Sequence, residues 1–477
     1  MLRTKIVCTL GPVSGDIETI RSFAEAGMAV ARINFSHGTY EEHAQRIQIV
    51  RKIANEIGRP IAVLVDLQGP KLRVGLLPGD AVQLVKGEPF TLVNADSSDE
   101  PSRIPVPHPE VLSEVEPGDR ILLDDGLLEL KVTAKEEAEV GVEVVTGGVL
   151  KSRKGISLPH TSIKMPSVTD KDRADARFAV QQGVDYFALS FVRAPQDVEH
   201  LRAFLDELDS DTPIIAKIEK PEAVDCIEEI LEVSDGMMVA RGDLGIEAPA
   251  EEVPIIQKRI IKLCNEASKP VITATQMLDS MMRNPRPTRA EASDVANAIL
   301  DGSDAVMLSG ETAVGSYPVQ TVQTMARIAE VTERSMPYQD WLHRSFLTGF
   351  RSVTEAISQV ATEIAAELEA TAIIASTVSG STARRVASHR PATPIISPTP
   401  DRATYRQLAL VWGVSPLLVD EFADTETMIV TVTEAARNRE LVKDGDLVMI
   451  TAGVPLGGSG LTNTLKAHRI GEERGWR

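Results

Sequence analysis

The sequence predicts a (β/α)₈ (TIM) barrel that is interrupted by an all-β domain and followed by a separate α/β domain. Eight short apolar, β-branched runs recur in the first two-thirds of the chain, and helix-like patterns lead into seven of them. Strands of this kind that alternate with helices indicate a parallel sheet buried on both faces. Eight of them favour a closed barrel, with an open doubly wound sheet as the alternative. The runs are Thr4–Leu10, Ala29–Phe35, Ile61–Leu67, Val184–Phe191, Pro213–Glu219, Gly236–Leu244, Val271–Met277 and Asp304–Leu308.

The interruption follows the third run, where short strands separated by Gly and Pro extend to about Pro166. The dipeptide Asp125-Gly126 between two of these strands is a hairpin signal. An insert at this point would sit above the C-terminal mouth of the barrel, where barrel active sites lie. We therefore expect a movable cap that excludes water. Its expected strands are Val82–Leu84, Phe90–Val93, Asp119–Leu123, Leu127–Thr133 and Glu139–Val145.

A second change of pattern near Trp341 predicts a separate α/β domain. We expect the barrel to comprise residues 1–69 and 168–340, the cap residues 70–167, and the C-terminal domain residues 341–477. The elements expected in the C-terminal domain are Val353–Leu368, Ser381–Ser388 and Tyr405–Val411 as helices, and Ala372–Ala375, Pro394–Ile396, Ser415–Val419 and Leu447–Thr451 as strands.

The composition excludes several classes of protein. The chain carries 50 Lys and Arg against 69 Asp and Glu, a net charge of −19, which repels nucleic acid and anionic membranes. Three cysteines do not suggest a disulfide framework, and they fit a reducing compartment. No apolar run has the length of a signal peptide core or a membrane span. We therefore expect a cytoplasmic protein.

Polar residues gather at the ends of the predicted strands, the usual place for catalytic groups in a barrel. Lys217 and Glu219 are two residues apart in one strand, so both side chains point to the same face. A structural Lys–Glu ion pair is the simpler interpretation. Asp243, at the end of the next strand, adds a second carboxylate, and two carboxylates completed by water and substrate oxygens suit Mg²⁺. Lys217 would then stabilise a phosphoryl group in transfer.

Other strand ends allow functional and structural interpretations. Arg32 has the fork geometry that suits phosphate, although it could equally cap a carboxylate. Gly242 and Gly245 flank Asp243 in a turn that we expect to start a helix. Their backbone N–H groups could approach an anion, although a simple turn is the alternative. Thr275 alone carries little signal, because threonine is common in strands.

Six stretches of the sequence resemble motifs of the pyruvate kinase family, in the family's order: RTKIVCTLGP, ARINFSHGTYEEH, AKIEKPEAV, GMMVARGDLGIE, ITATQMLDSMMRNPRPTRAE and SDAVMLSGETA. The resemblance spans nearly the whole chain. It implies a glycolytic enzyme that uses Mg²⁺ or Mn²⁺ to transfer the phosphoryl group of phosphoenolpyruvate to ADP, giving pyruvate and ATP. It also implies the family's usual homotetramer.

The resemblance assigns roles to individual residues. Arg32 and Arg73 are similar to the arginines that hold the phosphoryl group, Lys217 to the lysine that stabilises its charge, and Glu219 and Asp243 to the metal ligands. The substrate carboxylate would bind at Gly242, Asp243 and Thr275. The nucleotide would bind near Asn34, Ser36, His37 and Arg73, with Arg177 standing where the family usually has Lys. Protonation of the enolate is attributed in the family to a relay around the threonine and Ser309, which leaves the donor open.

The sequence departs from the family pattern at Lys71. Members that depend on a monovalent cation carry Glu there and hold K⁺ with groups equivalent to Asn34, Ser36 and Asp66. The ammonium of Lys71 could replace that cation, and the cation-independent members show the same Lys together with the Leu67-Gln68 pair. We therefore expect no requirement for K⁺. The alternative is that Lys71 is a solvated hinge residue and that K⁺ still binds.

The C-terminal domain resembles the family's effector domain. A hydroxyl-rich loop that we expect to start a helix and a glycine-rich loop suit a phosphorylated activator; plain helix capping by the hydroxyls is the alternative. Val378 and Val454-Pro455 replace groups found in relatives that respond to fructose 1,6-bisphosphate, so this activator is disfavoured. The expected effector residues are Thr377, Ser379, Ser381, Thr382, Gly458, Ser459 and Gly460.

Two other functions share part of this pattern. A barrel aldolase that forms a metal-bound enolate would have the Glu219 and Asp243 pair, but it would not need the cap together with Arg32 and Arg73. A catalytically silent sensor would have lost Lys217 or a carboxylate, and both carboxylates and the lysine are present.

Overall fold

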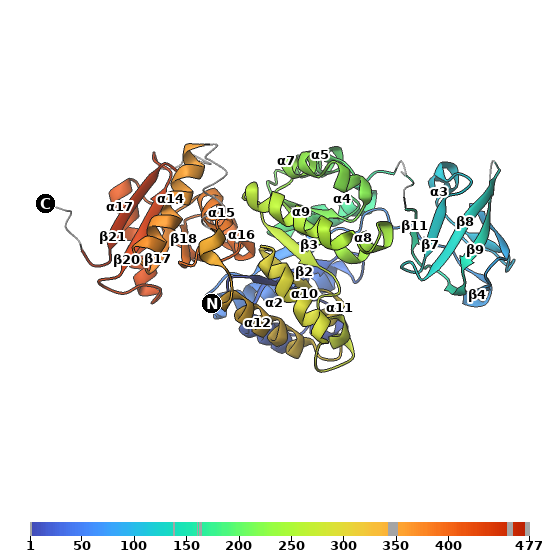
Figure 1. Cartoon of the computed structure of the whole chain (residues 1–477), viewed down its shortest axis with the longest axis horizontal. Helices are drawn as coiled ribbons and strands as arrows, with labels where there is room; N and C mark the ends of the chain where they lie inside the picture. Colours follow the sequence, from blue (N-terminus) through green and yellow to red (C-terminus); the bar gives the residue numbers. More distant parts are fainter. Residues whose placement is uncertain are drawn as a thin grey trace.

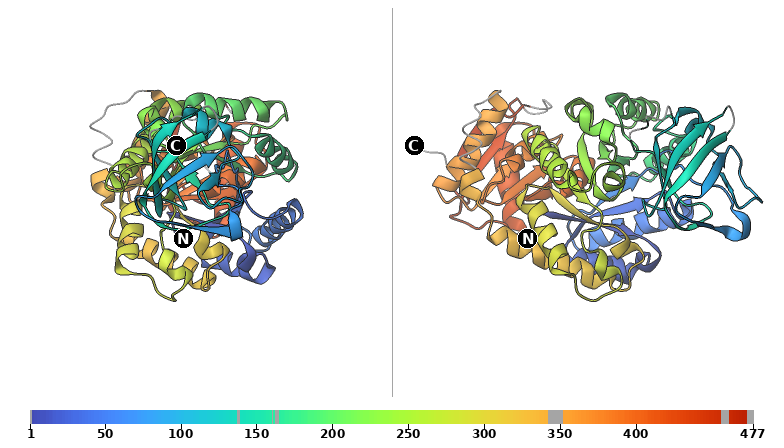
Figure 2. Two further views of the ribbon diagram at one scale, coloured as in Figure 1. Left: turned by 90° about the vertical axis from the view of Figure 1, so that its right-hand side faces the viewer. Right: turned by 45° about the vertical axis from the view of Figure 1, so that its right-hand side comes forward.

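Three parts follow one another along the long axis of the molecule (Figure 1). The structure is a computed structural model that describes residues 2–136, 139–159, 161, 165–341, 352–455 and 461–472. The all-β cap lies at one end, the barrel in the middle and the C-terminal α/β domain at the other end, and the second view in Figure 2 shows the same order. The cap and the C-terminal domain therefore lie at opposite ends of the barrel.

Eight parallel strands close into a barrel in the order β1-β16-β15-β14-β13-β12-β3-β2. This closure confirms the predicted barrel and excludes the open sheet. The strands are β1 (Lys5–Leu10), β2 (Met28–Asn34), β3 (Ala62–Asp66), β12 (Tyr186–Leu189), β13 (Ile214–Ile218), β14 (Gly236–Ala240), β15 (Val271–Ala274) and β16 (Ala305–Leu308).

The helices around the barrel begin where the sequence supplies a cap. In α2, the Thr39 hydroxyl accepts the Glu42 N–H and the Glu42 carboxylate accepts the Thr39 N–H, so two unpaired donors are satisfied. The same capping box opens α4 at Thr169 and α10 at Thr288. The helices are α1 (Ile17–Ala26), α2 (Tyr40–Glu56), α4 (Asp170–Gln181), α5 (Pro195–Asp206), α6 (Pro221–Asp225), α7 (Ile227–Val233), α8 (Arg241–Glu247), α9 (Val253–Glu266), α10 (Arg289–Leu300), α11 (Gly310–Ala313) and α12 (Pro318–Arg334).

Two predicted strands end well before the expected residue, whereas the other six end within about two residues of it. The sixth run stops at Ala240, because α8 starts at Arg241 and contains Gly242, Asp243 and Gly245. The residues predicted to form a turn in front of a helix therefore belong to the helix α8. The seventh run stops before Thr275, whose φ of +69° takes the backbone out of the strand conformation.

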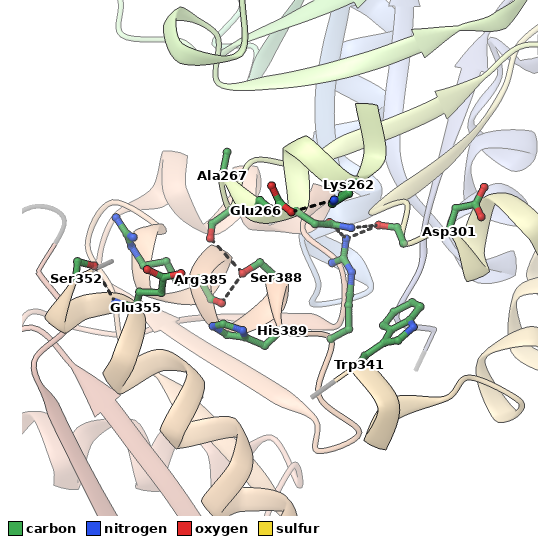
Figure 3. A pocket seen from close by; sticks show the side chains of 14 residues that line it. Lys262, Glu266, Ala267, Asp301, Trp341, Ser352, Glu355, Arg385, Ser388 and His389 are labelled. Carbon is green, nitrogen blue, oxygen red and sulfur yellow. Dashed lines mark hydrogen bonds and ion pairs between the residues drawn. The ribbon is translucent and has the colours of Figure 1, made fainter. Parts of the chain in front are cut away.

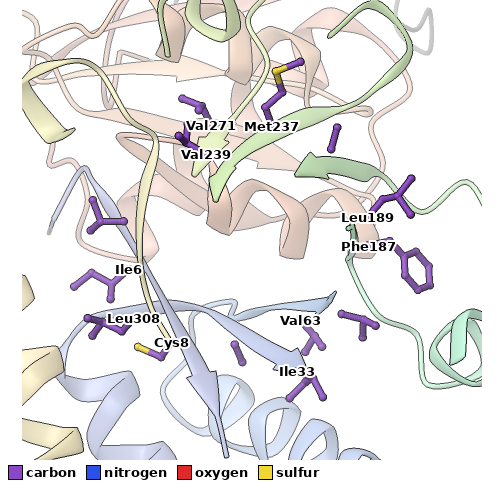
Figure 4. Packing of buried hydrophobic residues seen from close by; sticks show 14 of the residues in the cluster. Ile6, Cys8, Ile33, Val63, Phe187, Leu189, Met237, Val239, Val271 and Leu308 are labelled. Carbon is purple, nitrogen blue, oxygen red and sulfur yellow. The ribbon is translucent and has the colours of Figure 1, made fainter. Parts of the chain in front are cut away.

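Alternating side chains divide the barrel core into two clusters. In β1, Ile6 and Cys8 pack outward against the helices, while Val7 points into the barrel. Figure 4 shows outward-facing side chains of this kind on several strands. The inner cluster also includes Ala409 and Leu410 of the C-terminal domain. Residues of the C-terminal domain therefore share the core inside the barrel.

The cap is an all-β insert with two sheets, as predicted, but with more elements. The hairpin between β7 and β8 turns through Asp124, Asp125 and Gly126, which all have positive φ. The sequence missed β6, β10, β11 and the short helix α3 (Pro109–Glu114), because such short segments show no clear periodicity. The strands are β4 (Ala81–Leu84), β5 (Pro89–Val93), β6 (Arg103–Pro105), β7 (Arg120–Leu123), β8 (Leu128–Lys135), β9 (Glu139–Thr146), β10 (Gly148–Lys151) and β11 (Ile156–Ser157).

The C-terminal domain has one sheet with the order β19-β18-β17-β20-β21. The predicted helices and strands are present, whereas α17 and the antiparallel strand β21 were not predicted. No helix in the described ranges is both long enough and apolar enough to cross a bilayer. The elements are α14 (Val353–Glu367), β17 (Ala372–Ala375), α15 (Ser381–Ser388), β18 (Ile395–Thr399), α16 (Arg402–Gln407), η4 (Leu408–Leu410), β19 (Val414–Leu418), α17 (Thr425–Asn438), β20 (Leu447–Ala452) and β21 (Thr464–Arg469).

Candidate active site

A polar cavity of about 390 Å³ lies at the C-terminal ends of the barrel strands. The cap forms one wall of it through Asp124, Asp125, Arg153 and Lys154. The barrel contributes most of the predicted site residues. Those that line the cavity are Arg32, Asn34, Ser36, Asp66, Lys71, Arg73, Lys217, Glu219 and Asp243.

A larger cavity of about 600 Å³ lies elsewhere, where the ends of α9 and α10 meet α14 and α15 (Figure 3). It is next to the N-terminal ends of β15 and β16, away from the polar strand ends. The innermost cation in its wall, Arg390, is already bound to Asp304. Size alone therefore does not identify the site, and we take the smaller cavity as the candidate active site.

Lys217 lies at the centre of the site, with only 8 % of its surface exposed. Its Nζ is 2.8 Å from Glu219 Oε1 and 3.2 Å from Asp66 Oδ1, and it donates to Ser190 Oγ at 2.6 Å. Ser190 was not predicted, because a serine at a strand end carries no specific signal. The ammonium group is thus fixed by groups from β3, β13 and the end of β12.

Arg32 binds the other side of Asp66. Its Nε donates to Asp66 Oδ2 at 2.8 Å, a second guanidinium nitrogen lies 2.7 Å from the same oxygen, and Nη1 donates to Thr9 Oγ1 at 2.9 Å. The alternative of an Arg–carboxylate pair is therefore present in the structure. The guanidinium also lines the cavity, so the pairing and a phosphate contact are compatible.

The oppositely charged groups in this network stabilise one another's ionised forms. Burial alone lowers the pKa of Lys217, but the carboxylates of Asp66, Glu219 and Asp243 outweigh it and raise this pKa above its ordinary value. Burial raises the pKa of Asp66, yet Lys217 and Arg32 hold it below its usual value. Lys217 and Asp66 are therefore both ionised at neutral pH.

Asp243 differs from the other carboxylates of the site. The Asp243 residue is exposed, although protein atoms crowd its carboxyl group. This desolvation, together with the charge of Glu219, raises the pKa of Asp243 to about 6. The Asp243 carboxylate is therefore crowded by protein atoms and still accessible to a ligand. Within the described residues, no hydrogen bond reaches the Asp243 carboxylate.

Glu219 and Asp243 fit a hard divalent cation. Glu219 is held by Lys217 and by the Phe191 N–H, which donates to Oε2 at 2.9 Å. Asp243 offers carboxylate oxygens from α8 to the same cavity. Oxygen donors of this type, with room for water and substrate oxygens, are what Mg²⁺ and Mn²⁺ prefer.

Thr275 and Gly242 are neighbours, as the resemblance implied. The Gly242 N–H donates to Thr275 Oγ1 at 2.6 Å, and that hydroxyl donates to the Ala274 carbonyl at 2.6 Å. Thr275 and Gln276 both have positive φ. Arg241 holds this strained turn by donating to the Thr275 and Ala274 carbonyls at 2.7 and 3.1 Å. The sequence offered only one signal for Arg241, an arginine that ends an apolar strand.

Lys71 reaches the shell predicted for a monovalent cation. Its Nζ donates to Ser36 Oγ at 2.8 Å, and Asn34 Oδ1 accepts the Ser36 N–H at 3.0 Å. Lys71 is half-buried, and burial together with Arg73 and Lys217 lowers its pKa. Burial and the same cationic cluster lower the pKa of His37.

The expected nucleotide residues are only partly brought together. Arg73 is exposed in the cavity and donates to the Arg153 carbonyl at 3.0 Å. Arg153 and Lys154 of the cap add cationic groups that the sequence did not predict, because their position depends on how the cap sits. Arg177 is outside the cavity lining; it is exposed on α4 and its guanidinium lies 5.6 Å from the Phe204 ring.

The expected effector residues lie in the C-terminal domain. Gly380 caps α15 with φ +80° and no side chain caps this helix, so it begins at Ser381 and the hydroxyl-rich loop precedes it. Ser379 Oγ donates to Ser381 Oγ at 3.3 Å, and the hydroxyls of Thr382 and Thr462 are 2.9 Å apart. Thr377 is buried in the same loop. Gly458, Ser459 and Gly460 are outside the described residues.

Known proteins resemble the chain over almost its whole length. Family profiles for "Pyruvate kinase, barrel domain" and "Pyruvate kinase, alpha/beta domain" match residues 1–322 and 355–468. A pyruvate kinase of Geobacillus stearothermophilus is 49 % identical over 473 residues, which cover 98 % of this chain and 81 % of that protein. A pyruvate kinase of Sporosarcina psychrophila is 46 % identical over 475 residues, with 99 % and 81 % coverage. The chain therefore belongs to the pyruvate kinase family.

Proposed function

We propose that this phosphotransferase moves the phosphoryl group of phosphoenolpyruvate to ADP, with Mg²⁺ or Mn²⁺ held by Glu219 and Asp243. One observation carries the proposal: the buried ammonium of Lys217 lies 2.8 Å from Glu219 and faces the cavity that Asp243 also lines. A bound divalent cation would supply charge that neutralises the phosphoryl and enolate oxygens.

The protein groups position the substrate and stabilise its charge. Arg32 and Arg73 are available to hold the phosphoryl oxygens, and Lys217 is fixed where negative charge would develop. The Gly242 N–H and the Thr275 hydroxyl are suited to the carboxylate of the substrate, which would replace the bond that they now make with each other. Phosphoryl transfer needs mainly such positioning and charge stabilisation.

The nucleotide would approach between the barrel mouth and the cap. Asn34, Ser36, His37 and Arg73 provide polar and cationic groups, and Arg153 and Lys154 of the cap extend this positive region. Arg177 would reach a nucleotide only if the nucleotide extended beyond the cavity. Closure of the cap over the bound substrates would exclude water from the transfer.

The proposed enzyme does not require K⁺. The support is the position of the Lys71 ammonium, which bonds Ser36 next to Asn34 and is attracted by Asp66. The Lys71 ammonium, which is part of the protein, would supply at this position the positive charge that K⁺ supplies in other members of the family. The half-burial of Lys71 disfavours the alternative of a solvated hinge residue.

The test is pyruvate formation from phosphoenolpyruvate and ADP with Mg²⁺, in a K⁺-free buffer and again with added K⁺. Full activity without K⁺ is the expected result. Activity that appears only with K⁺ would keep the reaction and overturn the role of Lys71. Absence of pyruvate in both buffers, and also after addition of phosphorylated metabolites as activators, would overturn the proposed reaction.

Several further properties remain proposals. The loop that contains Thr377, Ser379, Ser381 and Thr382 is proposed to bind a phosphorylated activator. The protein is proposed to be a cytoplasmic homotetramer. The domain boundaries at residues 70, 168 and 341 also remain predictions, and limited proteolysis followed by mass spectrometry of the fragments would test them.

A further inference from the structure

Three residues beside the expected metal ligands line the same cavity and form a compact group, which we call the clamp: Phe191, Lys220 and Glu247. Lys220 Nζ lies 2.5 Å from Glu247 Oε1 and 4.7 Å from the centre of the Phe191 ring. Lys220 and Glu247 are 7 % and 6 % exposed. A cation that is held between a carboxylate and an aromatic face in a buried place is strongly fixed.

The clamp joins the ends of three consecutive barrel strands. Phe191 follows β12, Lys220 follows β13, and Glu247 is the last residue of α8, which follows β14. Each member is close to an expected metal ligand. The Phe191 N–H donates to Glu219, Lys220 is the neighbour of Glu219 in the chain, and Glu247 shares α8 with Asp243. The clamp therefore links the two segments that carry the metal ligands.

The backbone at Phe191 is strained. Its φ is +63°, a conformation that a bulky residue rarely adopts. This conformation accompanies the hydrogen bond to Glu219 and the contact of the ring with Lys220. Contacts from neighbouring elements must hold such a residue, and the clamp supplies one of them.

Glu247 depends on Lys220 for its charge balance. Its Oε2 is buried and has no hydrogen-bond partner among the described residues, while Oε1 is bound by Lys220. Loss of Lys220 would leave this carboxylate buried without a counter-charge, which is unfavourable. The end of α8 would then have to move toward solvent, and Asp243 at the start of the same short helix would move with it.

We propose that Lys220, Glu247 and Phe191 are positioning residues that set the separation between Glu219 and Asp243 and so determine the affinity for the divalent cation. The inference rests on the proposed metal site. Groups that orient metal ligands commonly change metal affinity by 10- to 100-fold when they are removed. A purely structural ion pair would change stability without changing the metal affinity of the folded protein.

The experiment is a titration of the full-length protein with Mn²⁺ in the absence of substrates, with free Mn²⁺ measured by electron paramagnetic resonance. Lys220→Met is expected to raise the Mn²⁺ Kd by about 10-fold or more. Lys220→Arg, which keeps the charge, is expected to restore most of the affinity. The matched control is Lys258→Met, which breaks the Lys258–Asp301 ion pair on the outside of the barrel and should leave the Kd unchanged.

The outcomes separate the two proposals. An unchanged Kd in folded Lys220→Met would overturn the positioning role and leave the metal site intact. Wild-type protein without saturable Mn²⁺ binding, or with binding that survives Asp243→Asn, would overturn the metal site itself. If Lys220→Met does not fold, Glu247→Gln is used in its place. It should raise the Mn²⁺ Kd in the same way, and an unchanged Kd would overturn the positioning role.

Discussion

The two ends of the barrel both bury charged side chains, but they treat them differently. At the N-terminal end, Asp304 receives Arg390 at 3.0 Å on each carboxylate oxygen, and the Val271 and Trp412 N–H groups at 3.1 Å. Asp185 receives Arg51 at 2.8 Å and the Val63 N–H at 2.7 Å on one oxygen. Arg406 of the C-terminal domain binds its other oxygen at 2.6 Å.

At the C-terminal mouth, charged groups are left partly open. The buried Oε2 of Glu247 has no hydrogen-bond partner among the described residues, and the exposed carboxylate of Asp243 accepts no hydrogen bond from them. Positive φ values occur at Phe191 and Thr275 at the mouth, and at Arg390 at the other end. Buried polar groups are normally satisfied, so such exceptions favour a site that is completed by ligands.

A structural network of buried charges differs from a binding network in how many of its carboxylate oxygens already have hydrogen-bond donors. Asp304 and Asp185 each have both carboxylate oxygens bound, and the donors come from the barrel and from the C-terminal domain. That network joins two domains and leaves no carboxylate oxygen of Asp304 or Asp185 open to a ligand. The mouth holds similar charges, but it keeps carboxylate oxygens and cations directed into a cavity. Mutations at the two ends should therefore affect different quantities.

The largest expected effect is on turnover, at the mouth. Lys217→Met removes the ammonium that faces the transferring group, and we expect kcat to fall by about 1,000-fold or more, because one preorganised charge is worth several kcal/mol in a transition state. Steady-state pyruvate formation measures the effect. Binding of Mn²⁺ should remain measurable, and a variant that keeps a tenth of the wild-type kcat would contradict the assigned role.

At the N-terminal end the expected effect is on stability. Arg390→Met leaves Asp304 buried at 4 % exposure without its counter-charge, and this should destabilise the protein by about 3–5 kcal/mol. Urea unfolding followed by circular dichroism measures the loss. The kcat of the protein that remains folded should stay within about twofold of wild type, because Arg390 lies at the end of the barrel away from the active site. A large fall in kcat without destabilisation would remove the distinction between the two ends.

The sequence predicted the barrel well, because buried parallel strands have a strong local signal. Apolar β-branched runs marked all eight strands, and the spacing of Lys217 and Glu219 placed both on one face of β13. The errors lie where the chain leaves a strand. The predicted strand extended past Ala240 to Leu244, yet Arg241–Glu247 form α8, so the helix begins earlier than the sequence pattern suggested.

The parts of the site that escaped prediction depend on contacts between segments distant in sequence. Lys220 and Glu247 are 27 residues apart, and no local pattern pairs them. Arg153 and Lys154 join the cavity only because the cap folds back over the barrel. In the cap, β11 has two residues, too few for an alternating pattern to be recognised. Residue types could be predicted, but their partners could not.

An intermediate effect is expected from charge reversal at Lys71. Lys71→Glu places a carboxylate beside Ser36 and Asp66, where a monovalent cation would then be needed to balance the charge. We expect activity without K⁺ to fall about 10-fold or more, a loss of about 1.4 kcal/mol, and to recover when K⁺ is added. Assays in Na⁺- and K⁺-containing buffers measure this effect.

The control for that variant is Lys86→Glu, which reverses an exposed charge on the cap and should leave the K⁺ response unchanged. If Lys71→Glu is equally active with and without K⁺, the ammonium of Lys71 does not act as an internal cation. The mouth would then differ from the N-terminal end only by its open carboxylates.

The smallest expected effect is a pH dependence of stability at the N-terminal end, from His389. Burial lowers the pKa of His389 from 6.5 to about 4, against the opposing attraction of Glu355. The unfolded chain therefore binds the proton first, so the contribution to stability is complete above pH 6.5 and is lost as the pH falls toward 4. At pH 5.5 the loss should be about 1.4 kcal/mol, or about 1–2 °C in Tm for a chain of this length.

The measurement is the difference in Tm between pH 7.5 and 5.5 for wild type and His389→Phe, since other groups also titrate in this range and contribute equally to both proteins. His389→Phe cannot bind the proton, so its Tm should fall less on acidification. Equal shifts in the two proteins would contradict the prediction. Because His389 lines the cavity between the barrel and the C-terminal domain rather than the mouth, the Michaelis constants for both substrates should be the same in the two proteins at either pH. A change in those constants would mean that protonation at the N-terminal end reaches the active site, and the two ends could no longer be treated as independent.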